Sequence, residues 1–276
     1  MSTILVFGAT GAVGRFLLPL LAPRYRVLPV SRTPAGADWL RADLNDESVA
    51  WPAADAVISL GPLDAFSVWL ERRGAGMPRR IVALSSMSAE SKRDSADAAE
   101  RALAQRLADA EARVLRCAAE HDGAATLLRP TLIYGGGSDR SLAPIARFAR
   151  RYRILPVPLR ASGLRQPVHA RDVATACVAA LEAPASHGKV YPLGGGERLR
   201  FDALLMRLRR AIPGAVLPLP VPIAALRLVA RLRAGGGFGA AALGRLCVPL
   251  VADNSAAQRD FSYAPGAFDE HAVLPE

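Results

Sequence analysis

The stretch that decides the fold lies near the start of the chain and reads Phe7-Gly8-Ala9-Thr10-Gly11-Ala12-Val13-Gly14-Arg15. It directly follows the strand-like run Thr3–Val6. A strand that ends in a glycine at every third position and then opens a helix is typical of a loop that binds dinucleotide phosphates. In such a loop the glycines permit a sharp turn, a close backbone approach to a pyrophosphate, and tight packing of the helix on the strand. The predicted cofactor contacts in this stretch are Gly8, Thr10, Gly11, Ala12, Val13, Gly14 and Arg15.

The second predicted strand, residues 26–30, ends in Ser31-Arg32-Thr33. A site that prefers NAD places an acidic residue near this point, about 20 residues past the glycines, to accept from the ribose 2′-hydroxyl. A guanidinium beside a hydroxyl instead suits a 2′-phosphate, because arginine pairs with phosphate through two parallel hydrogen bonds. We therefore predict NADP(H) as the cofactor, held in part by Ser31, Arg32 and Thr33. The alternative is that Arg32 is a solvated surface arginine.

Further strand-like runs alternate with helical stretches along the chain, at residues 54–60, 80–86, 125–130 and 189–193. The stretch 97–117 has the apolar spacing of a helix with one buried face. This alternation predicts an α/β fold with a Rossmann-type doubly wound parallel sheet. We divide the chain into an NADP-binding Rossmann domain at residues 1–135 and a mixed region at 136–276. The mixed region would hold a small C-terminal substrate lobe and late strands that return to the sheet.

Composition narrows the class of protein further. The three cysteines, Cys117, Cys177 and Cys247, lie far apart without the spacing of metal ligands, so we predict buried thiols in a reducing compartment and no metal site. No signal peptide fits the N-terminus, and the longest apolar run, residues 211–226, is broken by prolines. The net charge of +10 comes with only 6% aromatic residues and no known nucleic-acid motif. We predict a cytoplasmic protein that does not bind nucleic acid.

The C-terminal part of the chain suggests a second possible location in the cell, at the surface of a membrane. Residues 207–252 contain no acidic residue, and Arg227 and Arg231 stand at helical spacing beside leucines. Such a segment would dock as a basic helix on anionic lipid, giving peripheral contact with the inner face of a membrane. The alternative is an apolar lobe whose arginines extend to the solvent.

Motifs spread over most of the chain resemble those of extended short-chain dehydrogenases/reductases of the NAD-dependent epimerase/dehydratase family, which is rich in nucleotide-sugar enzymes. They are residues 8–15, 42–44, 84–86, 128–135, 166–174, 194–197 and 261–265. The resemblance implies that Asp43 lies against the adenine, Gly61 over the diphosphate or ribose, and Pro130 and Thr131 near the nicotinamide. The cofactor contacts it adds are Asp43, Leu44, Leu60, Gly61, Ser85, Pro130 and Thr131.

The chain departs from this family at the usual proton relay. Family members carry Tyr-x-x-x-Lys on the helix after the Ser-Ser strand, and a glutamate commonly follows four residues later. If that glutamate is Glu111, the relay positions fall on Leu103 and Leu107. Neither of the two lysines, Lys92 and Lys189, has a tyrosine four residues before it. The sequence therefore predicts an atypical family member.

Three residues are candidates to replace the relay: Ser86 at the end of a strand, Lys92 in the following loop, and Tyr134 at the end of the next strand. The competing interpretations are a turn serine, a solvated lysine and a packed tyrosine. For substrate binding we select Ser86, Arg165, His169 and Arg171, although a histidine in such a place is more often a loop or core residue. The acid-free run 140–171 with its many arginines suits a diphosphate.

These features predict an NADP(H)-binding oxidoreductase or epimerase that acts on a nucleotide-activated or lipid-linked sugar, so that the partner is a small sugar diphosphate. The alternative is a non-catalytic NADP(H)-binding redox sensor or an assembly or accessory subunit. Only a short helix fits at about residues 64–73, where the family uses a longer one for dimers. The oligomeric state therefore stays open.

Overall fold

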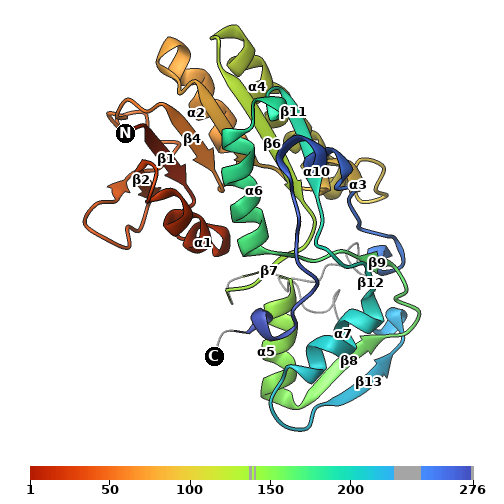
Figure 1. Cartoon of the computed structure of the whole chain (residues 1–276). Coiled ribbons are helices and arrows are strands. Elements are labelled where there is room, and N and C mark those ends of the chain that lie inside the picture. The colour runs from red at the N-terminus through yellow and green to blue at the C-terminus, as the bar shows by residue number, and fades with distance from the viewer. Residues whose placement is uncertain (137–138, 140, 227–243, 275–276) are drawn as a thin grey trace. The chain divides into compact units, whose positions relative to one another are not determined.

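The computed structural model describes residues 1–136, 139, 141–226 and 244–274 (Figure 1). The chain folds into two compact units, and each contains segments that are far apart in sequence. The sheet unit comprises Met1–Pro130, Ala170–Leu193 and Asp253–Ala264, and the second unit comprises Thr131–His169, Gly194–Ala252 and Pro265–Glu276. The functional division into residues 1–135 and 136–276 stays a prediction.

The sheet unit is built on seven parallel strands in the order β11-β6-β5-β4-β1-β2-β3. Their bounds are β1 Thr3–Phe7, β2 Arg26–Ser31, β3 Leu40–Arg41, β4 Ala56–Ser59, β5 Arg80–Leu84, β6 Ala124–Pro130 and β11 Lys189–Leu193. The strand order reverses beside β1, which places the glycine-rich loop at the point where open α/β sheets bind their ligands. The predicted α/β Rossmann-type fold is confirmed.

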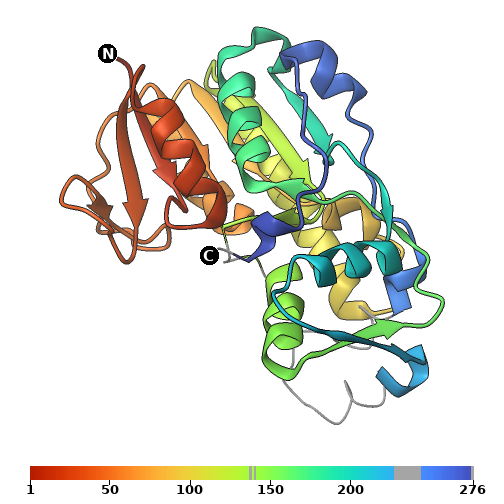
Figure 2. The same cartoon turned by 60° about the horizontal axis from the view of Figure 1, so that its bottom comes forward.

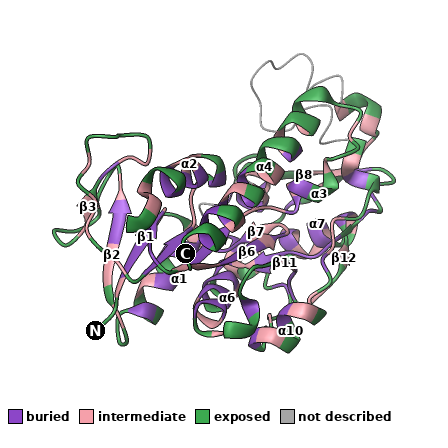
Figure 3. Ribbon diagram, turned by 90° about the horizontal axis from the view of Figure 1, so that it is seen from above, coloured by how far each residue is buried: buried purple, intermediate pink, exposed green. Residues whose placement is uncertain are grey.

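Helices cover both faces of this sheet, α1 packing against α6 and α2 against α4 (Figure 1). Their bounds are α1 Ala12–Leu21, α2 Leu63–Arg73, α3 Ser88–Ser91, α4 Ala98–Glu120, α6 Ala170–Glu182 and α10 Ser255–Phe261, with short 3-10 turns η1 Gly74–Gly76 and η2 Pro184–Ser186. The strands between them are largely buried (Figure 3). Under α2 and α4 the core contains a cluster of aromatic rings formed by Phe7, Trp51, Phe66 and Trp69.

The longest helix, α4, begins where its sequence predicts. The Asp97 carboxylate accepts hydrogen bonds from the N–H groups of Ala99 and Glu100, 2.8 and 3.1 Å away, and so caps the helix N-terminus. Its apolar face contains the buried Ala110 and Val114. The cap and the buried face together fix the start and the orientation of α4 in the sheet unit.

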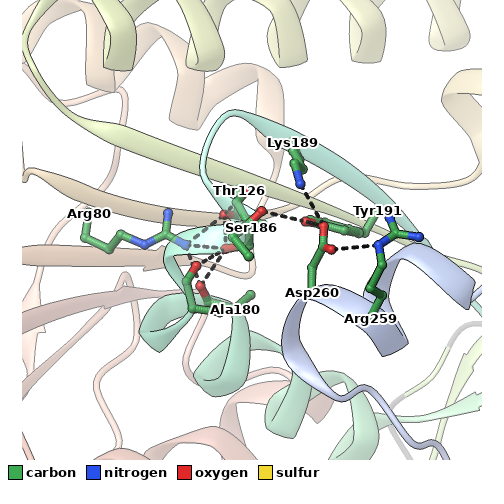
Figure 4. A network of polar contacts seen from close by, with 10 residues as sticks. Arg80, Thr126, Ala180, Ser186, Lys189, Tyr191, Arg259 and Asp260 are labelled. Carbon is green, nitrogen blue, oxygen red and sulfur yellow. Dashed lines mark hydrogen bonds and ion pairs between the residues drawn. The ribbon is translucent and has the colours of Figure 1, made fainter.

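The half-buried guanidinium of Arg80, at the start of β5, holds together the edge of the sheet where the strands begin (Figure 4). It donates to Thr126, to Ser186 and to the carbonyl oxygens of Ile81, Ala124, Ala180 and Leu181. Burial lowers the pKa of Arg80 to about 10. The arginine therefore ties the C-terminal end of α6 to β5 and β6.

A second polar cluster at the same edge joins the last segment of the sheet unit to β11 (Figure 4). The Asp260 carboxylate on α10 accepts from the Tyr191 hydroxyl at 2.7 Å and from Lys189 Nζ at 2.9 Å. These hydrogen bonds lower the pKa of Asp260 to about 2. Two segments that lie some 70 residues apart are thus fastened to each other.

The second unit contains three two-stranded pairs around a small core. Its elements are β7 Ile133–Tyr134, α5 Leu142–Tyr152, β8 Ile154–Pro158, β9 Leu164–Arg165, β10 Val168–His169, β12 Leu199–Arg200, α7 Phe201–Arg210, β13 Leu217–Val221, η3 Arg245–Cys247 and η4 His271–Val273. β8 and β13 form a parallel ribbon (Figure 2). Leu204, Leu208 and Phe268 are buried in the core. The segment with Arg227 and Arg231 lies outside the described residues.

The cysteines differ in burial. Cys117 and Cys177 are buried, as predicted, and burial raises the pKa of Cys177 to about 12. Cys247 is exposed, so the prediction is wrong for this residue, which lies on a surface turn with Sγ 3.2 Å from the Arg160 carbonyl oxygen. The described residues contain no helix long and apolar enough to cross a membrane.

Candidate functional site

The glycine-rich loop has the shape that its sequence predicts. Gly8 follows β1 with φ of +72°, and a Cβ there would lie 2.9 Å from the Gly61 nitrogen. A Cβ on Gly14 would lie 2.1 Å from the Ala9 carbonyl oxygen, which no side chain tolerates. Gly11 N–H donates to the Gly8 carbonyl at 3.0 Å and closes the turn. These close approaches explain why glycine is needed at positions 8 and 14.

The loop delivers the N-terminus of α1 to the carboxyl edge of the sheet. α1 begins at Ala12, and no side chain caps its first N–H groups. Thr10, Gly11 and Arg15 are exposed, Ala12 is half-buried, and Val13 is buried in the core. Uncapped helix N–H groups beside exposed backbone are suited to bind an anion. Val13 therefore serves the packing of α1.

The end of β4 lies beside the glycine loop and extends the exposed surface there. Leu60 N–H donates to the Phe7 carbonyl at 2.9 Å, which holds the end of β4 beside the glycine loop. A Cβ built on the next residue, Gly61, meets nothing within 4 Å. There is thus open space over Gly61, directly beside Gly8.

At the end of β2 the structure brings together two residues that the sequence treats separately. Arg32 Nη1 lies 3.9 Å from Asp43 Oδ2, and the Arg32 side chain is 81% exposed. The other Asp43 oxygen accepts from the backbone N–H and the side-chain amide of Asn45, at 2.9 and 3.1 Å. The Ser31 hydroxyl is bonded to the backbone of Thr33, which shapes the turn. Leu44 is half-buried beside them.

The carboxyl end of β5 carries a buried polar network. Glu111 on α4 is nearly fully buried and accepts two hydrogen bonds from Arg129 on β6, one from Nε at 2.8 Å and one from Nη2. The Ser85 hydroxyl donates to the same carboxylate. Arg129 also faces Glu90 at 3.5 Å, and the bond to Glu111 raises the pKa of Arg129.

Sequence reasoning noted Glu111 only as a family marker and missed its partner. The signal was present in Arg129, since a charged residue in an otherwise apolar strand requires a buried partner. This pair holds β6, α4 and Ser85 together at the edge where ligands bind.

Ser86 and Lys92, the two candidate residues that follow β5, both make polar contacts within the sheet unit. Ser86 is half-buried, and its hydroxyl accepts from the Ser88 N–H at 3.1 Å, leaving its own proton to donate elsewhere. Lys92 Nζ lies 3.6 Å from Glu100, and both side chains are mostly buried. On α4, Leu103 is half-buried, and Leu107 packs against the core.

Two further predicted residues of the sheet unit, Arg171 and Pro130, lie on α6 and at the end of β6. The Arg171 guanidinium stacks over the Phe16 ring at 5.3 Å, on the paired helices α6 and α1. Pro130 ends β6 and accepts from Met87 N–H at 3.2 Å. Among the described residues no group of His, Cys, Asp and Glu could hold a metal ion.

Four predicted residues belong to the second unit. Arg165 is buried and donates to the carbonyl oxygens of Leu164, Arg245 and Val248, and burial lowers its pKa. Its guanidinium joins β9 to the turn at residues 245–248, so we leave Arg165 out of the proposed site. The Thr131 hydroxyl donates to the Gln166 carbonyl.

Tyr134 and His169 pack together within the same unit. The Tyr134 hydroxyl accepts from Asp269 N–H at 2.9 Å, and its ring is fully buried between His169 and Phe268. His169 is half-buried, and a Cβ on Gly135 would lie 2.5 Å from its Nε2. Both side chains thus contribute to the packing of the second unit, and a catalytic role for Tyr134 stays a prediction.

The seven-stranded parallel sheet and the glycine loop together define a Rossmann-like α/β protein. A family model described as "NAD dependent epimerase/dehydratase family" matches residues 102–194. The resemblance to this family, predicted from sequence, is therefore confirmed. The sequence match lies in that segment, and the fold match extends over almost the whole chain.

Two solved structures illustrate the fold match. MoeE5 in complex with UDP-glucose and NAD has a TM-score of 0.74 at 19% identity, covering 98% of this chain and 96% of that one. RMD from Pseudomonas aeruginosa complexed with NADPH has a TM-score of 0.71 at 18% identity, covering 99% and 97%. Similar structures thus bind either nicotinamide dinucleotide.

One curated relative matches a shorter segment. It is the mitochondrial NADH dehydrogenase [ubiquinone] 1 alpha subcomplex subunit 9 of Arabidopsis thaliana, 43% identical over 72 residues. The match covers 26% of this chain and 18% of that protein, so it spans less than a fifth of the relative's length.

Proposed function

We propose that the chain binds NADP(H) in the glycine loop of the sheet unit and holds it without turnover, as a redox sensor or accessory subunit. The observation that carries this proposal is the apolar face of α4 at the relay positions, Leu103 and Leu107, which lie about two turns and one turn before Glu111. Glu111 itself is bonded to Arg129 and Ser85.

Hydride transfer to a carbonyl requires a group that delivers a proton to the developing oxyanion. A leucine supplies none. Of the candidate replacements, Lys92 is ion-paired with Glu100, and the Tyr134 hydroxyl accepts a backbone hydrogen bond in the second unit. These contacts favour a protein that retains the cofactor-binding surface and lacks the proton relay.

The preference for NADP(H) is supported by the exposed Arg32 at the end of β2. A 2′-phosphate carries about two negative charges and accepts bidentate hydrogen bonds from a guanidinium. The nearby Asp43 directs one oxygen to Asn45, and the other lies 3.9 Å from Arg32. We infer that Arg32 turns from Asp43 to the phosphate when the cofactor binds.

The accessory-subunit role gains support from the curated relative, which is described as a subunit of NADH dehydrogenase. A subunit of an assembly needs a stable cofactor-binding fold and no substrate. In this role the partner is a larger complex and the bound dinucleotide is a structural or sensing ligand.

The cofactor proposal is tested by titration. We expect NADPH to bind at least tenfold more tightly than NADH, a difference of about 1.4 kcal/mol. Arg32→Ala is expected to remove most of this difference, because it deletes the charge-assisted phosphate contact. Arg26→Ala, at the opposite end of β2, is the matched control and leaves both affinities unchanged. Equal affinities of the unaltered protein for the two dinucleotides would refute the preference.

A second candidate function is supported by the position of Ser86, half-buried at the carboxyl end of a parallel strand, where such sheets bind ligands. MoeE5, which shares the fold, is described with UDP-glucose bound. In this alternative the chain is a reductase or epimerase of a nucleotide-activated or lipid-linked sugar.

Turnover assays separate the two functions. We expect the purified protein neither to oxidise NADPH nor to epimerise the sugar when it is mixed with a sugar nucleotide or sugar-lipid. Both readouts are needed because an epimerase returns its hydride and consumes no net NADPH. Should either reaction occur, and Ser86→Ala lower it about tenfold through loss of one hydrogen bond to the reacting oxygen, the catalytic function would replace the proposed one. Ser91→Ala, on the exposed side of α3, is the control for a general effect on that segment.

A further inference from the structure

The whole net charge of the chain resides in the second unit. That unit contains 16 arginines, no lysine and six acidic residues, a formal charge of +10, which equals the net charge of the complete chain. The sheet unit contains 19 basic and 19 acidic residues and is neutral. Because the sheet unit includes residues 170–193 and 253–264, this separation follows from the fold and not from one contiguous segment.

Exposed apolar side chains gather in the same unit. Of the large apolar residues that are exposed in the described part of the chain, only Met1 and Leu20 belong to the sheet unit. The others are in the second unit: Phe148, Tyr152, Ile154, Leu159, Leu164, Leu217, Leu219 and Val248. A basic unit that also exposes large apolar side chains has the composition of an interaction surface.

Four of these residues belong to the end of α5 and to the β8–β13 ribbon that follows it (Figure 2). Ile154 is the register partner of Leu217, and Leu217 N–H donates to the carbonyl of Arg153 at 2.9 Å. Tyr152 and Leu217 are 60% and 64% exposed. Leu219 points to the same side of β13 as Leu217, since alternate residues of a strand share a face. We call Tyr152, Ile154, Leu217 and Leu219 the apolar tip.

Arginines border the apolar tip on α5. Arg147, Arg150 and Arg151 are all exposed, and their helical spacing places them on one stripe of the helix. Phe148 and Tyr152, whose rings are 4.7 Å apart, form the adjacent stripe. α5 thus presents a basic stripe beside an aromatic one, and the aromatic stripe leads into the apolar tip.

The ribbon is unsuited to recruit a strand from another protein. Leu217 and every second residue after it in β13 direct their N–H groups toward β8. Pro218 and Pro220 occupy the positions between these residues. The outward positions are therefore prolines, which have no N–H to donate. A strand of another protein could not form a ladder of hydrogen bonds along this edge. The exposed apolar side chains are therefore better suited to contact a surface that is not a β-strand.

We propose that the apolar tip and the arginine stripe of α5 bind the surface of an anionic lipid bilayer. The leucines, Ile154 and Tyr152 would enter the boundary between headgroups and acyl chains, while Arg147, Arg150 and Arg151 contact lipid phosphates. The described residues contain no spanning helix, so the contact is peripheral. This site differs from the segment with Arg227 and Arg231 and is independent of the proposed cofactor function.

Vesicle flotation tests the proposal with the full chain. We expect binding to vesicles of phosphatidylcholine mixed with phosphatidylglycerol, little binding to phosphatidylcholine alone, and a loss of binding as salt rises. The triple change Arg147→Gln, Arg150→Gln and Arg151→Gln should lower the partition coefficient about a hundredfold, since each arginine near such a surface contributes about fivefold. Leu217→Ser with Leu219→Ser should lower it at least about tenfold, because apolar contact is lost.

Matched variants in the sheet unit, which has no net charge, control for the loss of net charge and of surface hydrophobicity. Arg26→Gln, Arg79→Gln and Arg106→Gln remove the same charge from exposed sites, and Leu20→Ser alters an exposed leucine, so both should bind as the parent does. Far-ultraviolet circular dichroism and thermal unfolding establish that each variant is folded. All variants retain residues 227–243, so a loss of binding reports on α5 and the ribbon.

Three results would overturn the proposal. The first is no binding to the anionic vesicles at low salt. The second is a loss in the neutral-unit controls equal to that in the α5 variant. The third is that vesicle binding falls in the arginine variant but is unchanged in the variant of Leu217 and Leu219. Retained binding of the leucine variant to soluble polyglutamate would then identify an acidic protein as the partner of this face.

Discussion

Replacing Arg80 by methionine is expected to lower the free energy of unfolding by about 3 kcal/mol, because hydrogen bonds to a charged group contribute about 1.5–3 kcal/mol each and the carbonyls left behind are buried. Methionine fills most of the space of the aliphatic stem and donates nothing. The carbonyl oxygens of Ala180 and Leu181, at the end of α6, would lose their donor and the positive charge that the helix C-terminus favours. Urea unfolding monitored by circular dichroism measures the change.

The neighbouring arginine provides the control. Arg79 is exposed, so Arg79→Met is expected to change the stability by less than about 0.5 kcal/mol, as surface substitutions usually do. Arg80→Lys should fall between the two, because one ammonium group cannot reach acceptors on β5, β6 and α6 together. A loss below about 1 kcal/mol in Arg80→Met would show that the guanidinium network is not needed to fasten α6.

Gly61→Val is expected to weaken dinucleotide binding about a hundredfold and to leave the stability of the free protein unchanged, because forcing a side chain into an occupied site costs up to about 3 kcal/mol. In the free protein a Cβ at this position meets no atom within 4 Å. If the cofactor lies over Gly61, beside the Gly8 turn, the valine methyl groups would occupy its place. Fluorescence titration with NADPH and thermal unfolding measure the two properties.

Two glycine variants make this result specific. Gly76→Val places a side chain at ordinary contact distance from Arg73, away from the loop, and should leave binding unchanged. Gly14→Val should reduce both stability and binding, since its Cβ meets the Ala9 backbone. Unaltered NADPH affinity in Gly61→Val would mean that the dinucleotide does not lie over β4, and the proposed site would be wrong.

Local patterns were enough to predict the sheet unit's architecture. The alternation of apolar strands with helices predicted a parallel sheet, and the apolar spacing of residues 97–117 predicted α4. The glycine spacing predicted the turn at Gly8 and the close packing at Gly14. Each of these features depends on residues that are neighbours in sequence, so its physical cause is visible in a short window.

Side-chain pairing across the fold was not predictable in this way. Ser85, Glu111 and Arg129 come from three separate elements, and only their packing shows that they share one network. Likewise, the sequence predicted Arg165 at a diphosphate but did not reveal that its guanidinium bonds to the turn at residues 245–248. A charged side chain looks identical in sequence whether it faces a ligand or a buried carbonyl oxygen.

The sequence by itself determined the Rossmann-type fold, the dinucleotide loop and the absence of a Tyr-x-x-x-Lys relay, because these follow from local spacing and residue type. Only the tertiary structure decided which arginines bond to carbonyl oxygens inside the fold, as the half-buried Arg80 and the buried Arg165 do. It also decided that the net charge collects in one unit together with exposed side chains such as Leu217, since that unit is assembled from distant segments. Burial and charge segregation depend on long-range contacts, which no local window of the chain contains.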